Sequence, residues 1–281
     1  MSDELKIVVL IKQVPDTSSV AGVNPDGTVD RARAKRMINP FDKFALQKAL
    51  ELRAEHGGVI IAISMGPPPA IEVLFDAIEH GADKGFLLSD KRLAASDTLA
   101  TAYALFKCIE YIKDVDIVFT GLQTTDGDTA QTGPQIAERL NYPQITYCED
   151  LIVENGKVKA SRIIDGGVQK LEAPMPILVT VANSATRLEH KQFANVYRSK
   201  ELLRDEQAKK ERIQLLDLDK INADPKKVGL VGSPTVVGKT WKIGEKGGSC
   251  RLFKGAAVSK EVETLVDCLS TEGRGIEEYV R

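Results

Sequence analysis

The stretch DIVFT-GLQTTDGDTAQTGP, residues 116–134, joins a short apolar strand to a polar loop. The amphipathic run Pro134–Leu140 follows, so the loop lies between a strand and a helix. Between Gly121 and Pro134 it holds flexible glycines, four threonines, two glutamines and no Lys or Arg. Backbone N–H groups and hydroxyls at a helix N-terminus bind phosphate well. The loop therefore predicts a nucleotide phosphate site without a fixed positive charge.

A purely structural interpretation of this loop stays open. Asp126 and Asp128 are turn-forming residues that bond their own backbone. Two carboxylates beside a phosphate would repel it unless their charges are turned away.

Outward from the loop, strands and helices alternate, which predicts a parallel sheet with helices on both faces. Predicted strands are Lys6–Val14, Val59–Met65, Phe86–Ser89 and 116–120, and predicted helices begin at Asn39-Pro40, Ala70 and Ser96-Asp97. Asn39 is expected to cap the first helix, with Asp42 favouring the helix dipole or reaching back to the cap. Ligands of such sheets bind beyond the carboxyl ends of the strands. Asn39, Met65-Gly66 and Ser96-Asp97-Thr98 should converge there, although the Asn39 cap could also be purely structural.

The pattern changes after Leu140. Predicted antiparallel strands are Ile145–Val153, Lys157–Asp165 and Val168–Glu172, with hairpin signals at Asn155-Gly156 and Gly166-Gly167. Ile177–Ala182 is expected to rejoin the main sheet. Beyond it we expect an irregular segment to Lys200, a charged helix at Glu201–Arg212, an extended region over 223–250 and a short helix at Lys260–Leu269.

This organisation predicts three parts: an α/β core at 1–182, a segment at 183–230 and a C-terminal arm at 231–281. The arm has little core of its own, so we expect it to pack on another chain. The alternative is a tail that covers its own domain.

Composition excludes several classes of protein. The formal net charge of −2 argues against nucleic acid as a partner, and no apolar run is long enough for membrane insertion. The acidic N-terminus does not resemble a signal peptide, and the four separated cysteines favour free thiols in a reducing cytoplasm. We expect no metal site and no catalytic triad, because the three histidines are scattered. Residues 232–240, GSPTVVGKT, have one residue too many for a Walker phosphate loop.

An ordered set of motifs resembles the small (beta) subunit of electron transfer flavoproteins over nearly the full length. The motifs are Ile11–Pro15, Ile38–Asp42, Met65–Pro67, Gly81–Asp83, Ser96–Ala100, Gly121–Pro134, Ile164–Gly167 and Gly232–Thr235. The resemblance implies a Rossmann-like nucleotide-binding domain of the adenine-nucleotide α-hydrolase type, with antiparallel hairpin additions and an extended C-terminal arm. It also implies a heterodimer with an alpha subunit that carries one FAD.

The resemblance implies two branches. Ordinary members hold a structural AMP in the beta subunit, whereas electron-bifurcating members hold a second FAD there. That FAD accepts hydride from NADH and splits the electrons between ferredoxin or flavodoxin and a partner dehydrogenase of the acyl-CoA type. Residues 126–131, DGDTAQ, resemble the bifurcating branch, because glycine and alanine let a longer FAD pyrophosphate approach the backbone. The expected function is therefore bifurcation, with ordinary electron transfer as the alternative and a stand-alone nucleotide-binding or sensor module as a third.

Carried onto this sequence, the resemblance implies a cofactor-binding set and no catalytic residue. The set is Leu10, Asn39, Pro40, Phe41, Asp42, Met65, Asp97, Thr98, Gly121, Leu122, Gln123, Thr124, Thr125, Asp126, Gly127, Asp128, Thr129, Ala130, Gln131 and Thr132. The phosphates are expected around Thr129–Thr132. The resemblance also implies a recognition segment at about Asn183–Lys200 that docks a partner flavin dehydrogenase, with Phe193 as its apolar anchor. The arm would wrap the alpha subunit.

Overall fold

A computed structural model describes residues 4–16, 36–236 and 258–271. The strands are β1 (Leu5–Leu10), β2 (Gln13–Pro15), β3 (Arg36–Ile38), β4 (Gly58–Met65), β5 (Lys84–Leu88), β6 (Ile117–Gly121), β7 (Gln144–Glu154), β8 (Lys157–Ile164), β9 (Gly167–Pro174), β10 (Ile177–Val181) and β11 (Ile213–Leu216). The helices are α1 (Pro40–His56), α2 (Ile71–His80), α3 (Thr98–Ile112), α4 (Thr132–Leu140), α5 (Phe193–Leu202), α6 (Glu206–Arg212) and α7 (Val258–Thr271). Short 3₁₀ turns are η1 (Pro68–Ala70), η2 (Lys91–Leu93) and η3 (Pro225–Lys227).

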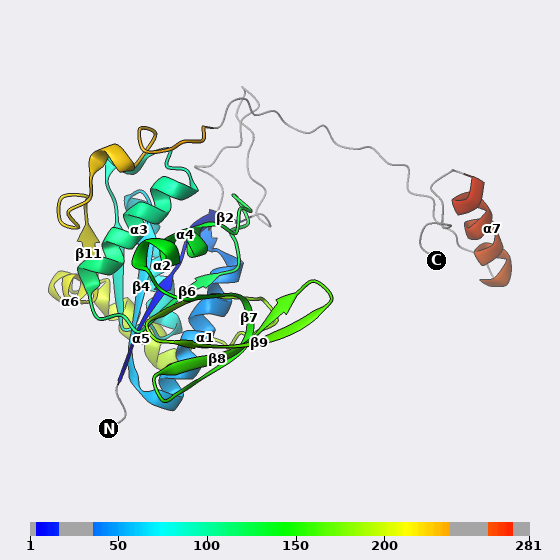
Figure 1. Ribbon diagram of the computed structural model, residues 1–281, viewed down its shortest axis with the longest axis horizontal. Coiled ribbons are helices and arrows are strands. Elements are labelled where there is room, and N and C mark those ends of the chain that lie inside the picture. The colour runs from blue at the N-terminus through cyan, green and yellow to red at the C-terminus, as the bar shows by residue number, and fades with distance from the viewer. Residues whose placement is uncertain (1–3, 17–35, 237–257, 272–281) are drawn as a thin grey trace. The chain divides into compact units, whose positions relative to one another are not determined.

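One mixed sheet organises the fold, in the order β11-β5-β4-β1-β6-β10-β7-β8-β9 (Figure 1). The pairs from β11 to β7 are parallel, and β7, β8 and β9 continue the sheet as an antiparallel meander. The predicted α/β class, the meander and the return of β10 to the main sheet are confirmed. The small sheet of β2 and β3 is antiparallel.

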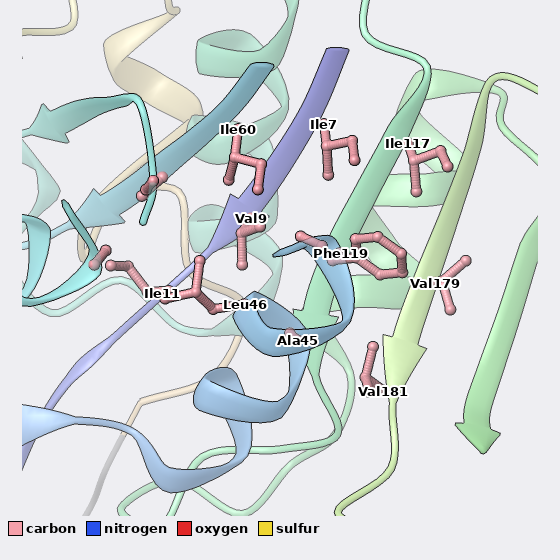
Figure 2. Packing of buried hydrophobic residues seen from close by; sticks show 14 of the residues in the cluster. Ile7, Val9, Ile11, Ala45, Leu46, Ile60, Ile117, Phe119, Val179 and Val181 are labelled. Atoms are coloured by element: carbon pink, nitrogen blue, oxygen red, sulfur yellow. The ribbon is translucent and has the colours of Figure 1, made fainter. Parts of the chain in front are cut away.

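Two layers of helices cover the parallel strands. Ile7 and Val9 point to the face that packs on α1 and α2, whereas Val8 and Leu10 point to the face that packs on α3 and α4. Successive side chains of a strand alternate between faces, so both faces of β1 become core. Figure 2 shows Ala45 and Leu46 of α1 lying over Val9, Phe119 and Val181.

Several predicted boundaries in the N-terminal half are corrected. The single strand predicted at Lys6–Val14 is two strands, because the Lys12 N–H turns to bond the Asp42 carboxylate, at 2.8 Å, between them. α4 begins at Thr132, two residues before the predicted Pro134.

The prediction failed more widely after residue 200. The single helix predicted at Glu201–Arg212 is two helices, because the Asp205 carboxylate caps α6 by accepting the N–H groups of Gln207 and Ala208. β11 was not predicted; its Ile213 and Leu216 are buried where it joins β5 at the sheet edge. The described part of the region predicted as extended, 223–236, forms turns and a 3₁₀ turn.

Contacts divide the chain into two units between Gly238 and Lys239, with α7 in the second. The predicted terminal helix is confirmed as α7, although it is longer than Lys260–Leu269. Cys108 and Cys148 are buried thiols. Cys250 and residues 237–240 of the Walker-like stretch lie outside the described residues.

Candidate functional site

A cavity of about 730 Å³ lies at the carboxyl ends of β1, β4 and β6. The chain places β4 on one side of β1 and β6 on the other, and such a switch in strand order leaves a crevice suited to a ligand. The predicted site residues that line the cavity are Leu10, Asp42, Met65, Asp97, Thr98, Gly121, Leu122, Gln123, Thr124, Gly127, Thr129, Ala130, Gln131 and Thr132. The structure thus brings distant sequence motifs into one space.

The other predicted residues lie outside the cavity lining: Asn39, Pro40, Phe41, Thr125, Asp126 and Asp128. Asn39 nevertheless holds the loop that follows β6. Its buried Nδ2 donates to the Gln123 carbonyl at 2.8 Å, and its Oδ1 accepts the Thr125 N–H at 3.2 Å. Asn39 occupies the N-cap position of α1 but makes no side-chain cap bond, so the expected cap is corrected: the amide serves the loop instead.

Asp42 joins the ends of β1, β6 and α1 beneath the cavity. Its carboxylate accepts the Lys12 N–H at 2.8 Å and Asn39 Nδ2 at 2.9 Å, and it also accepts the Gly121 N–H. Burial raises the pKa of Asp42 to about 7, against the opposing effect of these donors and of the Lys12 charge. A Cβ on Gly121 would lie 2.4 Å from Asp42 Oδ1, so only glycine fits this strand end.

A cation does reach the loop, which corrects the expectation of a site without fixed positive charge. Lys12 Nζ lies 2.8 Å from Asp126 Oδ1, across 114 residues of sequence. Burial alone would raise the pKa of Asp126, but the hydrogen bond and charge of Lys12 outweigh burial and hold that pKa low. Asp128 has a left-handed backbone, with φ of 51°, and its N–H donates to the Thr124 carbonyl at 2.9 Å. The repulsion expected from Asp126 is therefore compensated within the chain.

The first turn of α4 supplies the neutral donors. Gln131 stands at its N-cap and makes no side-chain cap bond, while Gln131, Thr132 and Gly133 line the cavity. The first N–H groups of a helix have no partner within the helix and attract anions. A Cβ on Gly133 would meet Thr120 Oγ1 and Thr180 at 3.0 Å, so this turn sits close against β6 and β10.

Sequence reasoning missed part of the lining. Besides Ser96, whose motif was expected at these strand ends, the further lining residues are Ile11, Lys12, Ile63, Leu99, Thr101, Leu105, Thr120, Gly133, Gln135, Pro234 and Thr235. Thr235 donates from its N–H and its hydroxyl to Asp97 Oδ2, at 3.1 and 2.8 Å, while Asp97 Oδ1 caps α3 through the Ala100 N–H. Gly232–Thr235 was among the motifs that carry the family resemblance, but no contact with Asp97, 138 residues away from Thr235, was predicted from it.

A second hollow, of about 650 Å³, lies between α2, α5 and α6. Its lining sets four arginines against four carboxylates: Arg53, Arg198, Arg204 and Arg212, with Asp83, Glu201, Asp205 and Glu211. The N-terminus of α6 lies at this hollow but is capped by the Asp205 carboxylate, and no Ser or Thr is among the described residues that line it. The first cavity, with its uncapped turn and its hydroxyls, is therefore the better candidate site.

The predicted recognition segment becomes helical at Phe193, the first residue of α5. The Phe193 side chain is 83% exposed, and its ring centroid lies 6.4 Å from that of Tyr197. Lys191 anchors the preceding residues to α2 through Asp76 and Glu79. An exposed aromatic pair is thus carried on a well-attached helix.

Membrane-spanning helices and metal-binding clusters are both absent from residues 4–16, 36–236 and 258–271. There, no helix has the length and apolar character to cross a membrane. Within the same ranges, no three His, Cys, Asp or Glu side chains gather in a way that could hold a metal ion.

Comparison with known proteins identifies the family. Residues 26–220 match the Electron transfer flavoprotein domain. The chain is 37% identical to the electron transfer flavoprotein subunit beta of Thermoanaerobacterium thermosaccharolyticum, over 95% of this chain and 98% of that protein. It is 38% identical to the acryloyl-CoA reductase electron transfer subunit gamma of Anaerotignum propionicum, over 94% and 98%. It is 40% identical to protein FixA of Azorhizobium caulinodans, over 83% of each chain. The chain therefore belongs to the electron transfer flavoprotein family, as a beta-type subunit.

Proposed function

We propose that this chain is the small subunit of a heterodimeric, electron-bifurcating flavoprotein and binds FAD in the cavity at the ends of β1, β4 and β6. The observation that carries the proposal is the combination of that cavity with the uncapped first turn of α4. The chain acts only together with an alpha subunit that holds the other FAD, and it works in the cytoplasm.

The residues of the cavity suit an adenine nucleotide. Apolar groups from Leu10, Ile63 and Met65 offer a surface for the adenine, and the N–H groups and hydroxyls of Thr129–Thr132 would hold the phosphates. A bound flavin supplies the hydride and single-electron chemistry, with NADH as the donor. The chain's own residues bind it, orient it and set the local charge, and none acts as acid or base.

Small residues in the loop favour FAD over AMP. Ala130 adopts a left-handed φ of 54° and lines the cavity beside Gly127. Short side chains here leave the backbone open to a pyrophosphate that continues beyond the AMP half of the cofactor. The printed name of the Anaerotignum relative, an electron transfer subunit of acryloyl-CoA reductase, agrees with transfer to or from an acyl-CoA type dehydrogenase. Ferredoxin or flavodoxin would take the other electron.

Two surfaces serve the partners in this proposal. Asn183–Lys200 docks the partner flavin dehydrogenase, with the exposed Phe193 ring as the apolar anchor. The arm, residues 231–281, packs on the alpha subunit through α7, whose Val258, Val262 and Leu265 are 74%, 51% and 40% exposed.

The ordinary flavoprotein with a structural AMP is the second candidate, favoured by the subunit beta of Thermoanaerobacterium, whose name specifies electron transfer alone. An assay of NADH oxidation distinguishes the bifurcating function from the ordinary one. A bifurcating heterodimer oxidises NADH only when both the high- and the low-potential acceptor are present. NADH oxidation that proceeds with only one of the two acceptors present, or no NADH oxidation with both present, would favour the ordinary function.

The phosphate contacts can be tested separately. Replacing Thr129→Val together with Thr132→Val removes two cavity hydroxyls and keeps the side-chain volume nearly constant. We expect nucleotide retention at limiting FAD to fall by about tenfold or more, since each hydrogen bond to a charged group contributes about 1.5–3 kcal/mol. Thr146→Val, on β7 and outside the cavity lining, is the control. Unchanged occupancy in the double variant would place the phosphates elsewhere.

A further inference from the structure

Lys12 holds a fixed place at the edge of the cavity. Its N–H donates to Asp42 Oδ2 at 2.8 Å, and its carbonyl accepts the Asn39 N–H at 2.9 Å. Because the backbone is tied on both sides, the ammonium can change partners only by turning its side chain. That side chain lines the cavity and is 45% exposed.

Charge in the cavity is otherwise unfavourable for a phosphate. Among the described residues that line it, Lys12 is the only cation, whereas Asp42 and Asp97 are both carboxylates. Each of these carboxylates is already engaged by N–H donors from the chain. A phosphate in this cavity lies near at least one carboxylate charge, that of Asp97, so a counter-charge would stabilise it in addition to the neutral donors of α4.

The present partner of Lys12 is easily replaced. Asp126 stands outside the cavity lining, its side chain is 36% exposed, and only one of its oxygens meets Lys12. Exposed single-contact ion pairs are weak, whereas a phosphate offers an ammonium several strong acceptors. The geometry therefore allows a direct exchange between the two anions.

We propose that Lys12 is the phosphate-contacting cation of this cavity and that Asp126 is an internal anion which holds Lys12 until a phosphate displaces it. The inference rests on the proposed nucleotide site and adds to it a binding residue and a competitor. It gives Asp126 a role in a loop that is proposed to bind phosphate. It also predicts that the two members of one ion pair have opposite effects on ligand affinity.

The test uses the nucleotide-stripped heterodimer, titrated calorimetrically with AMP, FAD and adenosine. Lys12→Met should weaken AMP and FAD binding by about tenfold, the effect expected of a lost charge-assisted hydrogen bond. Asp126→Asn should strengthen both several-fold, because it removes the competitor. Adenosine, which has no phosphate, should bind all variants alike. Lys12→Arg should restore most of the affinity for AMP.

A matched surface pair provides the control. Lys159 and Glu154 also lie 2.8 Å apart, with side chains 47% and 50% exposed, and Lys159→Met and Glu154→Gln should leave affinity unchanged. The inference is wrong if Lys12→Met and Asp126→Asn change the affinity for AMP in the same direction. It is also wrong if the affinity for adenosine changes as much as the affinity for AMP, because the ion pair is then structural. Wild-type protein that binds neither AMP nor FAD would instead reject the proposed nucleotide site.

Discussion

Asp42 is a buried residue of the fold that also lines the cavity. Because burial raises its pKa from 3.8 to about 7, the folded chain binds a proton there that the unfolded chain releases. The contribution of Asp42 to the free energy of unfolding is thus largest at low pH and falls as pH rises from about 4 to about 7.

Comparison with Asp42→Asn separates the pH-dependent contribution of Asp42 to the free energy of unfolding from that of the other carboxylates. The stability difference, wild type minus variant, should decrease between about pH 5 and pH 7 by at most about 1.4 kcal/mol per pH unit and level off above. Urea unfolding at several pH values measures it. A difference that does not change with pH would show that Asp42 stays ionised throughout.

Gly121 tests the close approach of β6 to α1. In Gly121→Ala the new Cβ meets Asp42 Oδ1 at 2.4 Å and the Phe41 carbonyl carbon at 2.7 Å, so the helix must shift. We expect a loss of about 1–3 kcal/mol in unfolding free energy, as for other overpacked sites, with weaker nucleotide retention. Gly167→Ala is the control, since a Cβ there meets nothing within 4 Å. Equal stability of the two variants would contradict this packing.

Sequence reasoning could choose the residues of the site but not their partners. Asn39, Asp42 and Asp126 were selected from motifs and positions near strand ends. Their bonds span large separations, 84 residues from Asn39 to Gln123 and 114 from Lys12 to Asp126, and no local pattern encodes such pairs. This is why Asn39 was assigned a helix cap and Lys12 no role.

At the scale of elements, strands with a continuous apolar run were predicted correctly, whereas the short strand β11, with few buried residues, was not predicted. The buried strands β4, β6 and β10 have continuous apolar runs that propensity and burial both favour. β11 spans four residues with only its two ends buried, so its strand state depends on pairing with β5 rather than on its own sequence. α5 likewise owes its position to packing on α2.

The exposed ring on α5 gives an element-scale prediction. Phe193→Ala should leave thermal stability unchanged, because the ring is 83% exposed. It should raise the KM for the partner dehydrogenase about tenfold or more, as loss of an interface anchor does. Electron-transfer kinetics with that dehydrogenase measure the effect. Leu215→Ala, at a 56% exposed position on β11, is the control, and an equal effect of both variants would remove Phe193 from the interface.

For the whole molecule, α7 offers the sharpest test of assembly. Val262 and Leu265 lie on one side of the helix, one turn apart, and are 51% and 40% exposed. Val262→Asp with Leu265→Asp should raise the dissociation constant of the alpha subunit by about a hundredfold, since burying carboxylates in an apolar contact is costly. Sedimentation or co-purification measures it, with Glu263→Gln as control. Unimpaired association would show that α7 does not bind the alpha subunit.

The α/β architecture was predicted from the alternation of strands and helices, which is typical of a parallel sheet with helices on both faces. The assembly and its cofactor were predicted only through the family resemblance, because partner chains and ligands leave no local pattern that periodicity or spacing reveals.

The nucleotide content of the heterodimer tests the central claim most directly. The complex is purified anaerobically, denatured, and its released FAD and AMP are separated and counted against protein. The account predicts two FAD and no AMP per heterodimer. One FAD with one AMP would contradict it and assign the chain to ordinary electron transfer.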